Sequence, residues 1–391
     1  MIDNILIENM RLLLAQTDTQ FIRYKYTQID WSLRMIGLVG PRGVGKSTMV
    51  LQRIKMEQTH QKPLYISADS SYFTQHTLIE TAADFVKEGG THLYIDEIHK
   101  YEDWSRELKE IYDLHPSLKI IFTGSSILDI QKGQADLSRR AITYHMQGLS
   151  FREYLQFFHH IVVDPIPLDK VINNDWRELP VEHPLPLFRH YLQEGYYPFS
   201  KEGAYNVRLD QIVTQTLETD IAQYASLSIT TGRKLRRLMS IVSQSAPFKP
   251  DYTSIANSLG VSRNIVPNYL VYMERTGLIG QLRDETGGLR SLGKVEKVYL
   301  DNTNLMYALG ADLTNIGNVR ETFFYNQVRV VADVISSKVA DFMIGNHTFE
   351  VGGKKKGQAQ IAGVTNGHIV KDDIEYGSGK IIPLWAFGLL Y

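Results

Sequence analysis

Cysteine is absent from the sequence, which excludes disulfide bonds, thiolate metal sites and cysteine nucleophiles. A surplus of charge is absent as well, because 42 lysines and arginines nearly balance 43 aspartates and glutamates and leave a formal net charge of −1. This balance argues against a protein that coats DNA over its whole surface, but it leaves room for a local basic patch.

Long hydrophobic runs are also missing. The longest apolar run, Ile381–Tyr391, is interrupted by Pro383 and is too short to cross a bilayer. Residues 1–10 have no basic segment ahead of an apolar one, so they do not predict a secretory signal. Hydrophobic residues still make up 43% of the 391 residues, which is enough for a substantial core and excludes wholesale disorder. We therefore expect a cytoplasmic protein of two or three domains with no membrane segment.

Short apolar runs alternate with helical patterns in the first 150 residues. The expected strands are 35–39, 64–66, 92–95 and 119–122, and the expected helices are 4–17, 47–56 and 104–112. This alternation predicts a parallel sheet that is covered by helices on both faces.

A glycine-rich stretch follows the first expected strand and fits the pattern G-x-x-x-x-G-K-[ST]. Its residues are Gly40, Pro41, Arg42, Gly43, Val44, Gly45, Lys46, Ser47 and Thr48. Glycines permit backbone conformations that are closed to other residues, so successive N–H groups can converge on phosphate oxygens. The helix expected from Lys46 adds its positive end to the same place. Lys46 would then contact the outer phosphates and Ser47 would bind Mg²⁺, whereas the alternative is an ordinary glycine-rich turn.

Two acids end the expected strand at 92–95. A carboxylate at a strand tip beside the loop can hold Mg²⁺, and the next one can polarise the attacking water. We assign the metal to Asp96 and the role of general base to Glu97. The last of the four expected strands, 119–122, runs into Thr123–Ser126, where a hydroxyl could contact the terminal phosphate or the water. An ordinary strand-to-helix turn explains these residues equally well.

Together these motifs resemble the prokaryotic AAA+ ATPases of the archaeal, STAND-like branch, and more closely a bacterial subgroup whose ATPase carries a C-terminal domain of unknown function. The residues that carry the resemblance are Gly40–Thr48, Tyr94–Trp104, Thr123–Ser126, Leu137–Arg140 and Leu149–Leu155. The resemblance implies ATP or ADP as ligand, Mg²⁺ as cofactor and a helical lid after the core. It also implies that Ser125 is the sensor and that Arg140 is a phosphate-sensing or finger arginine, which makes Glu97, Lys46, Ser125 and Arg140 the expected catalytic residues. The family has glycine where this chain has Arg139, so either guanidinium is a candidate.

Residues 252–275 resemble a helix-turn-helix, and the hairpin expected over 278–300 would be its wing. In this interpretation Gly260 makes the turn and Ser262 caps the second helix. The expected shared core is Ile255, Leu259, Ile265, Tyr269, Leu270 and Met273. Arg263 and Asn264 would face a DNA groove, but Pro267 is expected to kink the second helix. A winged helix used only for packing or oligomer contacts is the alternative, and the basic cluster at 233–237 has the pattern of a solvated helix face.

Three acids in the last 90 residues resemble the metal-binding core of the restriction-endonuclease-like PD-(D/E)xK fold. They are Glu321 on an expected helix, Asp341 at the start of a strand and Glu350 after the next one. Gly352 occupies the place of the lysine that orients the attacking water in that fold, so an inactive domain is favoured, with Lys354 as the only substitute. Alternatively, the segment 352–357 is a polyanion-binding loop.

The predicted fold class is α/β: a P-loop, AAA+-like parallel-sheet core, a helical lid, a winged-helix segment and a small C-terminal nuclease-like domain. The expected boundaries are 1–150, 151–245, 246–300 and 301–391. The expected function is ATP hydrolysis with Mg²⁺, coupled to movement of C-terminal domains that bind a partner, with DNA through 252–275 and a homo-oligomer as candidates. The alternatives are a slow nucleotide switch and an ATP-dependent nuclease.

Overall fold

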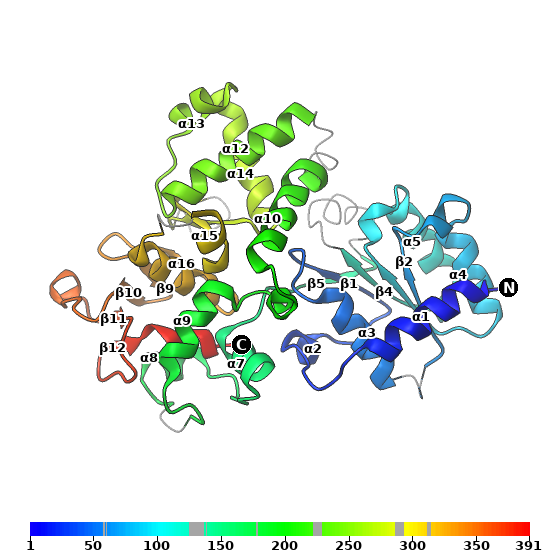
Figure 1. The fold of residues 1–391 in the computed structure, drawn as a ribbon, viewed down its shortest axis with the longest axis horizontal. Helices are drawn as coiled ribbons and strands as arrows, with labels where there is room; N and C mark the ends of the chain where they lie inside the picture. The colour runs from blue at the N-terminus through cyan, green and yellow to red at the C-terminus, as the bar shows by residue number, and fades with distance from the viewer. Residues whose placement is uncertain are drawn as a thin grey trace. The chain divides into compact units, whose positions relative to one another are not determined.

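The structure is a computed structural model that describes residues 1–57, 59, 61–124, 137, 139–176, 179–221, 229–285, 293–310 and 314–391. The chain forms two compact units, Met1–Gly148 and Leu149–Tyr391 (Figure 1). The first predicted domain, 1–150, corresponds to the first unit, and the other three predicted segments lie together in the second. Among the described residues, no helix combines the length and the apolar character needed to cross a membrane.

The first unit is built around a five-stranded parallel sheet in the order β2-β3-β4-β1-β5. Its strands are β1 (Met35–Val39), β2 (Pro63–Ser67), β3 (His92–Asp96), β4 (Lys119–Gly124) and β5 (Ile142–His145). Its helices are α1 (Asn4–Gln16), α2 (Lys25–Gln28), α3 (Lys46–Glu57), α4 (Leu78–Lys87) and α5 (Trp104–Leu114), with 3₁₀ turns at Ser71–Thr74 and Ile98–Lys100. The parallel sheet and every strand expected from the sequence are confirmed.

Helices cover both faces of this sheet because the strand order reverses direction after β2. Right-handed crossovers place α3, which leads from β1 to β2, on one face and α4 and α5 on the other. Helix α1 packs against α3, and α4 packs against α5. All five residues of β1 are buried, as expected for a strand covered on both sides. The carboxyl ends of β1, β3 and β4 meet at one edge of the sheet, where the predicted site residues lie.

The second unit begins with helices and ends with a mixed sheet. Its helices are α7 (Phe151–His159), α8 (Leu168–Ile172), α9 (Pro184–Glu194), α10 (Tyr205–Gln215), α12 (Ile229–Ser245), α13 (Tyr252–Leu259), α14 (Val266–Arg275), α15 (Thr303–Gly310) and α16 (Ile316–Val328), and Thr216–Asp220 form a π-helical turn after α10. Its strands are β6 (Ile279–Arg283), β7 (Val295–Leu300), β8 (Ile335–Ser336), β9 (Phe342–Ile344), β10 (His347–Gly352), β11 (Gly367–Lys371) and β12 (Ile381–Pro383), and 3₁₀ turns lie at Pro198–Glu202, Arg263–Ile265, Ala359–Ile361 and Leu384–Leu389.

Aromatic packing explains why segments far apart in sequence share this unit. Phe188 of α9 and Phe323 of α16 meet edge to face at 4.7 Å between ring centroids, and Phe151 of α7 contacts both Phe188 and Trp385. Such pairs add about 0.5–1.5 kcal/mol each beyond the burial of their surface. The start of the unit and its C-terminal turn therefore belong to one core.

The two helices and the hairpin predicted over 252–300 are present, with three corrections. Pro267 lies in the first turn of α14, where the N–H that proline lacks has no partner within the helix, so the expected kink was wrong. Ile265 is 38% exposed, and Val266 is buried in its place. Ser262 precedes the short turn Arg263–Ile265 but makes no capping hydrogen bond with its side chain. Gly260 does make the turn, with φ at 61°.

The C-terminal sheet has the order β12-β11-β10-β9-β8. Strands β10, β11 and β12 run parallel, whereas β8 and β9 form antiparallel pairs. Helix α16 packs against β10, and Phe324 of α16 contacts Phe349 of β10 at 5.4 Å between ring centroids. This arrangement brings one face of α16 to the strands that carry Asp341 and Glu350.

Candidate functional site

The glycine-rich stretch forms a turn between β1 and α3, as predicted. Gly43 and Gly45 have φ values of 77° and 93°, in the left-handed region that favours glycine. Gly40 is required for a different reason, since a Cβ atom there would lie 2.1 Å from the carbonyl oxygen of Met146. The turn is therefore held against the segment that follows β5.

Lys46 begins α3 at the end of this turn and is buried. Its ammonium group donates to the carbonyl oxygens of Gly40 and Pro41, at 2.9 and 2.7 Å. These bonds hold the ammonium at the start of the loop, close to the backbone amides that follow.

Asp96 and Ser47 come together at the edge of the sheet. The Ser47 hydroxyl donates to Asp96 Oδ1 at 2.9 Å, although 49 residues separate the two in sequence. Hydroxyl and carboxylate oxygens are the ligands that Mg²⁺ prefers, so the donor set fits the metal that was predicted for this pair. Asp96 is 7% exposed, which shields its charge from bulk water.

Two further hydroxyls orient Asp96. A hydroxyl in the stretch that includes Thr123 was expected to contact phosphate or water rather than Asp96, and Tyr65 was not expected at the site. Tyr65 of β2 donates to Asp96 Oδ2 at 2.8 Å, and Thr123 of β4 donates to Asp96 Oδ1. Burial and the neighbouring Asp96 raise the pKa of Tyr65 well above its usual range, so that it remains a donor. Tyr65 lies on β2 and Thr123 on β4, the two strands that pair with β3, and this pairing brings both hydroxyls to Asp96.

Glu97 follows Asp96 with a left-handed backbone, at φ 49° and ψ 40°. Its N–H donates to the Thr123 hydroxyl at 3.2 Å. Its carboxylate lies 3.8 Å from the Arg42 guanidinium and 3.6 Å from Nε2 of His99. The strand end thus turns the Glu97 side chain toward the phosphate loop, in which Arg42 lies.

Arg140 does not lie with these residues. It precedes β5 and forms a two-point ion pair with Asp113 of α5, at 3.0 and 2.8 Å. Because β5 runs parallel to β1, Arg140 lies at the amino ends of the strands, whereas the loop follows their carboxyl ends. Five residues of strand, at about 3.3 Å each, separate the two edges. Arg139 is exposed, and Ser125 lies outside the described residues.

A second group of charged residues, which we call the carboxylate cluster, lies in the second unit. It comprises Glu321 of α16, Asp341 beside β9 and Glu350 of β10, with Lys297 and Lys356. Lys297 Nζ lies 2.8 Å from Glu321 and 3.5 Å from Asp341. Burial alone would lower the pKa of Lys297, but attraction to these two carboxylates outweighs burial and raises it.

Lys356, rather than the expected Lys354, pairs with Glu350. A Cβ atom added to Gly352 would lie 2.7–2.8 Å from three carbons of the Lys356 side chain. The Lys356 side chain therefore fills the space beside Gly352 and brings its ammonium to Glu350, so the assignment to Lys354 was wrong. Burial raises the pKa of Glu350, although the bond from Lys356 lowers it. Within the described part of the chain, no group of three or more acids or histidines is close enough to hold a metal ion.

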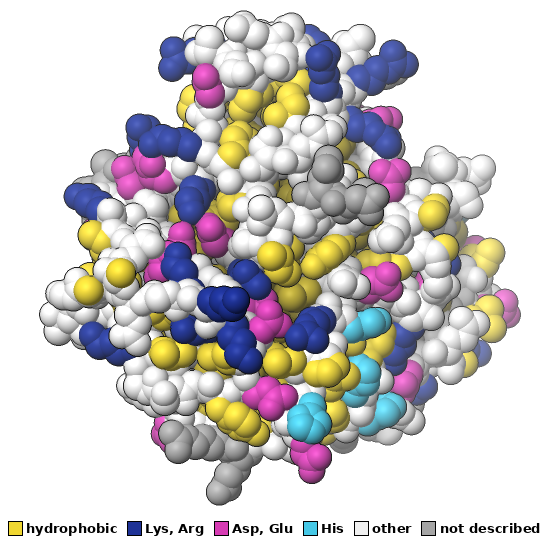
Figure 2. Space-filling view, turned by 60° about the vertical axis from the view of Figure 1, so that its left-hand side comes forward, with side chains coloured by type: hydrophobic (Ala, Val, Ile, Leu, Met, Phe, Trp, Pro, Cys, Tyr) yellow, Lys and Arg dark blue, Asp and Glu magenta, His cyan; other side chains and the backbone are white. Residues whose placement is uncertain are grey.

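Basic side chains surround this cluster. Lys354 and Lys355 are exposed, and Lys371 donates to the carbonyl oxygen of Lys354 at 3.3 Å. Figure 2, in which the left-hand side of Figure 1 comes forward, shows a group of lysine and arginine side chains on this face with acidic side chains beside it.

The basic cluster at 233–237 is partly engaged within its own unit. Lys234 donates to the carbonyl oxygen of Gly260, and Arg236 donates to the Thr214 hydroxyl and lies near Asp210 and Glu218. These contacts support the interpretation of a helix face rather than a phosphate track.

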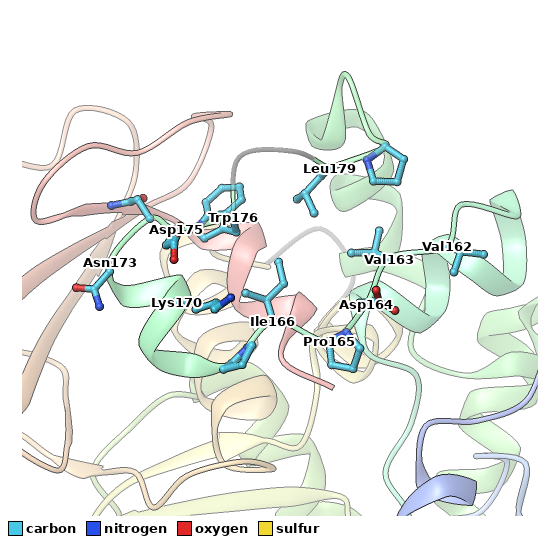
Figure 3. A pocket seen from close by; sticks show the side chains of 13 residues that line it. Val162, Val163, Asp164, Pro165, Ile166, Lys170, Asn173, Asp175, Trp176 and Leu179 are labelled. Carbon is cyan, nitrogen blue, oxygen red and sulfur yellow. The ribbon is translucent and has the colours of Figure 1, made fainter.

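A cavity of about 810 Å³ opens in the second unit along the segment that connects α7 to α9 in the sequence. Figure 3 shows that its labelled side chains, Asp164, Lys170 and Trp176 among them, all come from this connection and from α8. The described residues that line it include none of those predicted to carry chemistry, so the size of a cavity does not identify the site here.

Comparison with known proteins agrees with the geometry of the first unit. Residues 32–155 match a family model described as an AAA domain, and residues 185–318 match a domain of unknown function (DUF8612). The uncharacterized protein MJ1637 of Methanocaldococcus jannaschii is 26% identical over 278 residues, which cover 65% of this chain and 58% of that protein. The chain thus spans less than two thirds of the length of this relative.

Among solved structures, the Walker-type ATPase paby2304 of Pyrococcus abyssi aligns with a TM-score of 0.43 and 11% identity, over 76% of this chain and 99% of that one. The replication initiator DnaA bound to AMPPCP and single-stranded DNA aligns with a TM-score of 0.30 and 14% identity, over 68% and 86%. The match to an AAA domain and the order of the parallel sheet agree in giving the first unit the fold of a P-loop NTPase core.

Proposed function

We propose that the chain binds ATP with Mg²⁺ at the phosphate loop, hydrolyses it, and uses the nucleotide state to control what the second unit binds. The observation that carries this proposal is the 2.9 Å hydrogen bond between Ser47 and Asp96, beside a glycine turn that opens α3. It unites the metal ligands and the phosphate-binding backbone in one place.

Each residue of the site has a role that follows from its chemistry. Lys46 would exchange the carbonyl oxygens of Gly40 and Pro41 for phosphate oxygens, which are stronger acceptors because they are charged. Ser47 and Asp96 would hold Mg²⁺, which neutralises charge on the transferred phosphoryl group. Glu97 would accept a proton from the attacking water at its carboxylate.

The position of Arg140 indicates which nucleotide it could contact as an arginine finger, that of its own chain or that of a neighbouring copy. Within one chain, Arg140 lies at the amino ends of the strands, whereas the loop lies at their carboxyl ends. If Arg140 contributes to hydrolysis, it does so from a neighbouring copy, which is a proposal that requires an oligomer.

Titration of Mg·ATP into the full chain tests nucleotide binding, and a single-turnover assay tests hydrolysis. The expected results are heat on binding and release of phosphate. Glu97→Gln should retain binding and lose about a hundredfold or more in turnover, because general-base catalysis contributes 10²–10⁴-fold. Turnover at the parental rate would show that Glu97 is not the base, and bound ATP that survives for hours in the parent would favour the nucleotide switch.

The carboxylate cluster favours a second candidate function, an ATP-dependent nuclease. The contact between Lys356 and Glu350 supports this function. In the nuclease fold a lysine stands at the position of Gly352, and the ammonium of Lys356 beside Glu350 can take over its role. DNA could be bound by the lysines around the cluster and by the exposed Arg263 and Asn264. Plasmid DNA incubated with the protein, ATP and Mg²⁺ or Mn²⁺ should be nicked, and Asp341→Ala should abolish the nicking. Intact plasmid with both metals would remove this function.

A further inference from the structure

Arg23 is a buried cation behind the phosphate loop and lies outside the glycine-rich motif at 40–48. It is 4% exposed, which is rare for arginine and costs free energy unless its N–H groups are bonded. One terminal nitrogen, Nη1, donates to the carbonyl oxygen of Val44 in the loop. The other, Nη2, donates to the carbonyl oxygens of Gln147 and Gly148, at 2.8 and 2.9 Å.

The bond to Val44 fixes the direction of an amide in the loop. The Val44–Gly45 peptide is planar and trans, so its N–H points away from its C=O. Because the C=O is directed at Arg23, the N–H of Gly45 is directed to the opposite side. Convergent N–H groups are what a phosphate loop offers to its ligand. Arg23 therefore holds one of these donors in place without any need to touch the nucleotide.

The bonds to Gln147 and Gly148 connect the same guanidinium to the last residues of the first unit. Tyr24 reinforces this connection, because its hydroxyl donates to the side chain of Gln147 at 3.1 Å. The planar fork of arginine suits it for holding several carbonyl groups in a fixed relation. A change in the position of Val44 is thereby transmitted to residues 147 and 148.

The next residue is anchored in the second unit. The N–H of Leu149 donates to the carbonyl oxygen of Tyr196 at 2.8 Å. The hydroxyl of Tyr191 donates to the carbonyl oxygen of Leu149 at 2.7 Å. Gly148 and Leu149 are thus adjacent in the chain but are bonded within different units. The two residues share one peptide bond, so a displacement at Gly148 acts directly on the backbone of Leu149.

Arg23 itself is well fixed. Gln52 of α3 donates to the carbonyl oxygens of Asp18 and Phe21, at 2.8 and 2.9 Å. The segment before Arg23 is thus attached to the helix that begins at Lys46. Loop, helix and guanidinium form one connected framework.

We infer that Arg23 is a positioning residue that aligns the Gly45 amide for phosphate and couples occupancy of the loop to the junction between Gly148 and Leu149. This inference rests on the proposed nucleotide site, and it assigns to Arg23 a role in both affinity and communication.

Hydrogen exchange of the full chain, with and without saturating Mg·ADP, tests the inference through peptides that cover 38–50 and 142–150. In the parent, nucleotide should increase protection in both peptides. Arg23→Met should lower Mg·ADP affinity about tenfold or more, since the charge-assisted bond that holds the Val44 carbonyl, and with it the Gly45 amide, is lost. It should also lose the nucleotide-dependent protection of 142–150, even when a higher concentration restores saturation.

Three further variants separate positioning from general destabilisation. Arg11→Met removes an exposed arginine of α1 and should behave as the parent. Arg23→Lys keeps the charge but loses the planar guanidinium with its several N–H groups. It should recover part of the Mg·ADP affinity and less of the nucleotide-dependent protection of 142–150. This variant replaces Arg23→Met in the test if Arg23→Met does not fold. Tyr24→Phe should weaken the protection of 142–150 while leaving affinity nearly unchanged.

Arg23→Met with parental affinity, or with parental protection of 142–150 at saturation, would overturn the inference. Absence of nucleotide binding in the parent would instead overturn the proposed function, and the two failures are distinguishable because only the second removes protection of 38–50 in the parent.

Discussion

The phosphate loop and the carboxylate cluster are both sites of converging polar groups, but they are built in different ways. The loop is a single stretch of nine residues whose backbone supplies most of the donors. The cluster takes its side chains from α16, β7 and β10, from Asp341 just before β9 and from Lys356 after β10. A backbone site requires particular residues at fixed spacing, because only glycine adopts the conformations of Gly43 and Gly45 easily. A side-chain site tolerates a shifted residue when a long side chain can reach the same place.

The largest expected effect is at the loop. Lys46→Ala removes the buried ammonium and should lower nucleotide affinity about a hundredfold or more, because charge-assisted bonds to phosphate are about twice as strong as neutral ones. Calorimetry with Mg·ATP measures this effect, with circular dichroism to show that the fold is retained. Binding within a few-fold of the parent would mean that the loop does not hold the phosphates.

Gly40→Ala should destabilise the first unit by about 2–3 kcal/mol, at the upper end of what overpacking costs. The added Cβ would collide with the carbonyl oxygen of Met146, which is backbone and cannot turn aside as a side chain does. Denaturant unfolding of the full chain measures the loss. Gly357→Ala is the matched control, since nothing lies within 4 Å of a Cβ atom there, and an equal loss in both variants would contradict the argument.

Lys356→Ala should have a smaller effect that depends on pH. Glu350 already has a pKa above its ordinary value of 4.5, and the bond from Lys356 opposes that rise. Without Lys356 the folded-state pKa rises further, so the folded state binds its proton more tightly than the unfolded state does. The variant should then be nearly as stable as the parent below the unfolded pKa and lose about 1–3 kcal/mol as pH rises toward neutrality.

Unfolding curves at about pH 4 and pH 7.5 measure this difference. Lys354→Ala is the control, because Lys354 is exposed and should change stability little at either pH. An equal deficit at both values of pH, or the same pH dependence in Lys354→Ala, would show that the contact between Lys356 and Glu350 does not control the titration.

The smallest expected effect is at Arg140. Arg140→Ala breaks an ion pair with the largely exposed Asp113, and exposed pairs contribute little to stability. Nucleotide affinity and single-turnover hydrolysis in dilute, monomeric protein should be unchanged, because Arg140 lies at the other edge of the sheet. A large loss of turnover confined to an assembled form would assign the residue a role across subunits, and a loss in the monomer would contradict the geometry.

Most of the first unit could be predicted from sequence because its signals are local. The apolar runs defined the strands, and the glycine pattern placed the loop between β1 and α3. The contributions of Tyr65, Thr123 and Arg23 could not be found in this way, since each depends on which strands or loops become neighbours. Strand order is a property of the whole sheet, and no short motif records it.

Two predictions for the second unit, at Pro267 and at Lys354, were wrong. Pro267 was expected to disturb a helix because the start of α14 was placed too early, and one turn of displacement made the residue harmless. Lys354 was chosen by its nearness in sequence to Gly352, whereas the bend of the chain after β10 brings Lys356 to Glu350. Both errors come from assigning three-dimensional position by counting residues.

The left-handed backbone of Glu97 sets stability against activity at a single position. Residues other than glycine lose about 1–2 kcal/mol in this conformation, and asparagine is among the few that visit it readily. An asparagine or glycine at this position would relieve the strain and raise the melting temperature, yet it would lack the carboxylate that we propose as the general base. Selection for thermal resistance alone would thus favour a form of the protein that holds its nucleotide and no longer consumes it.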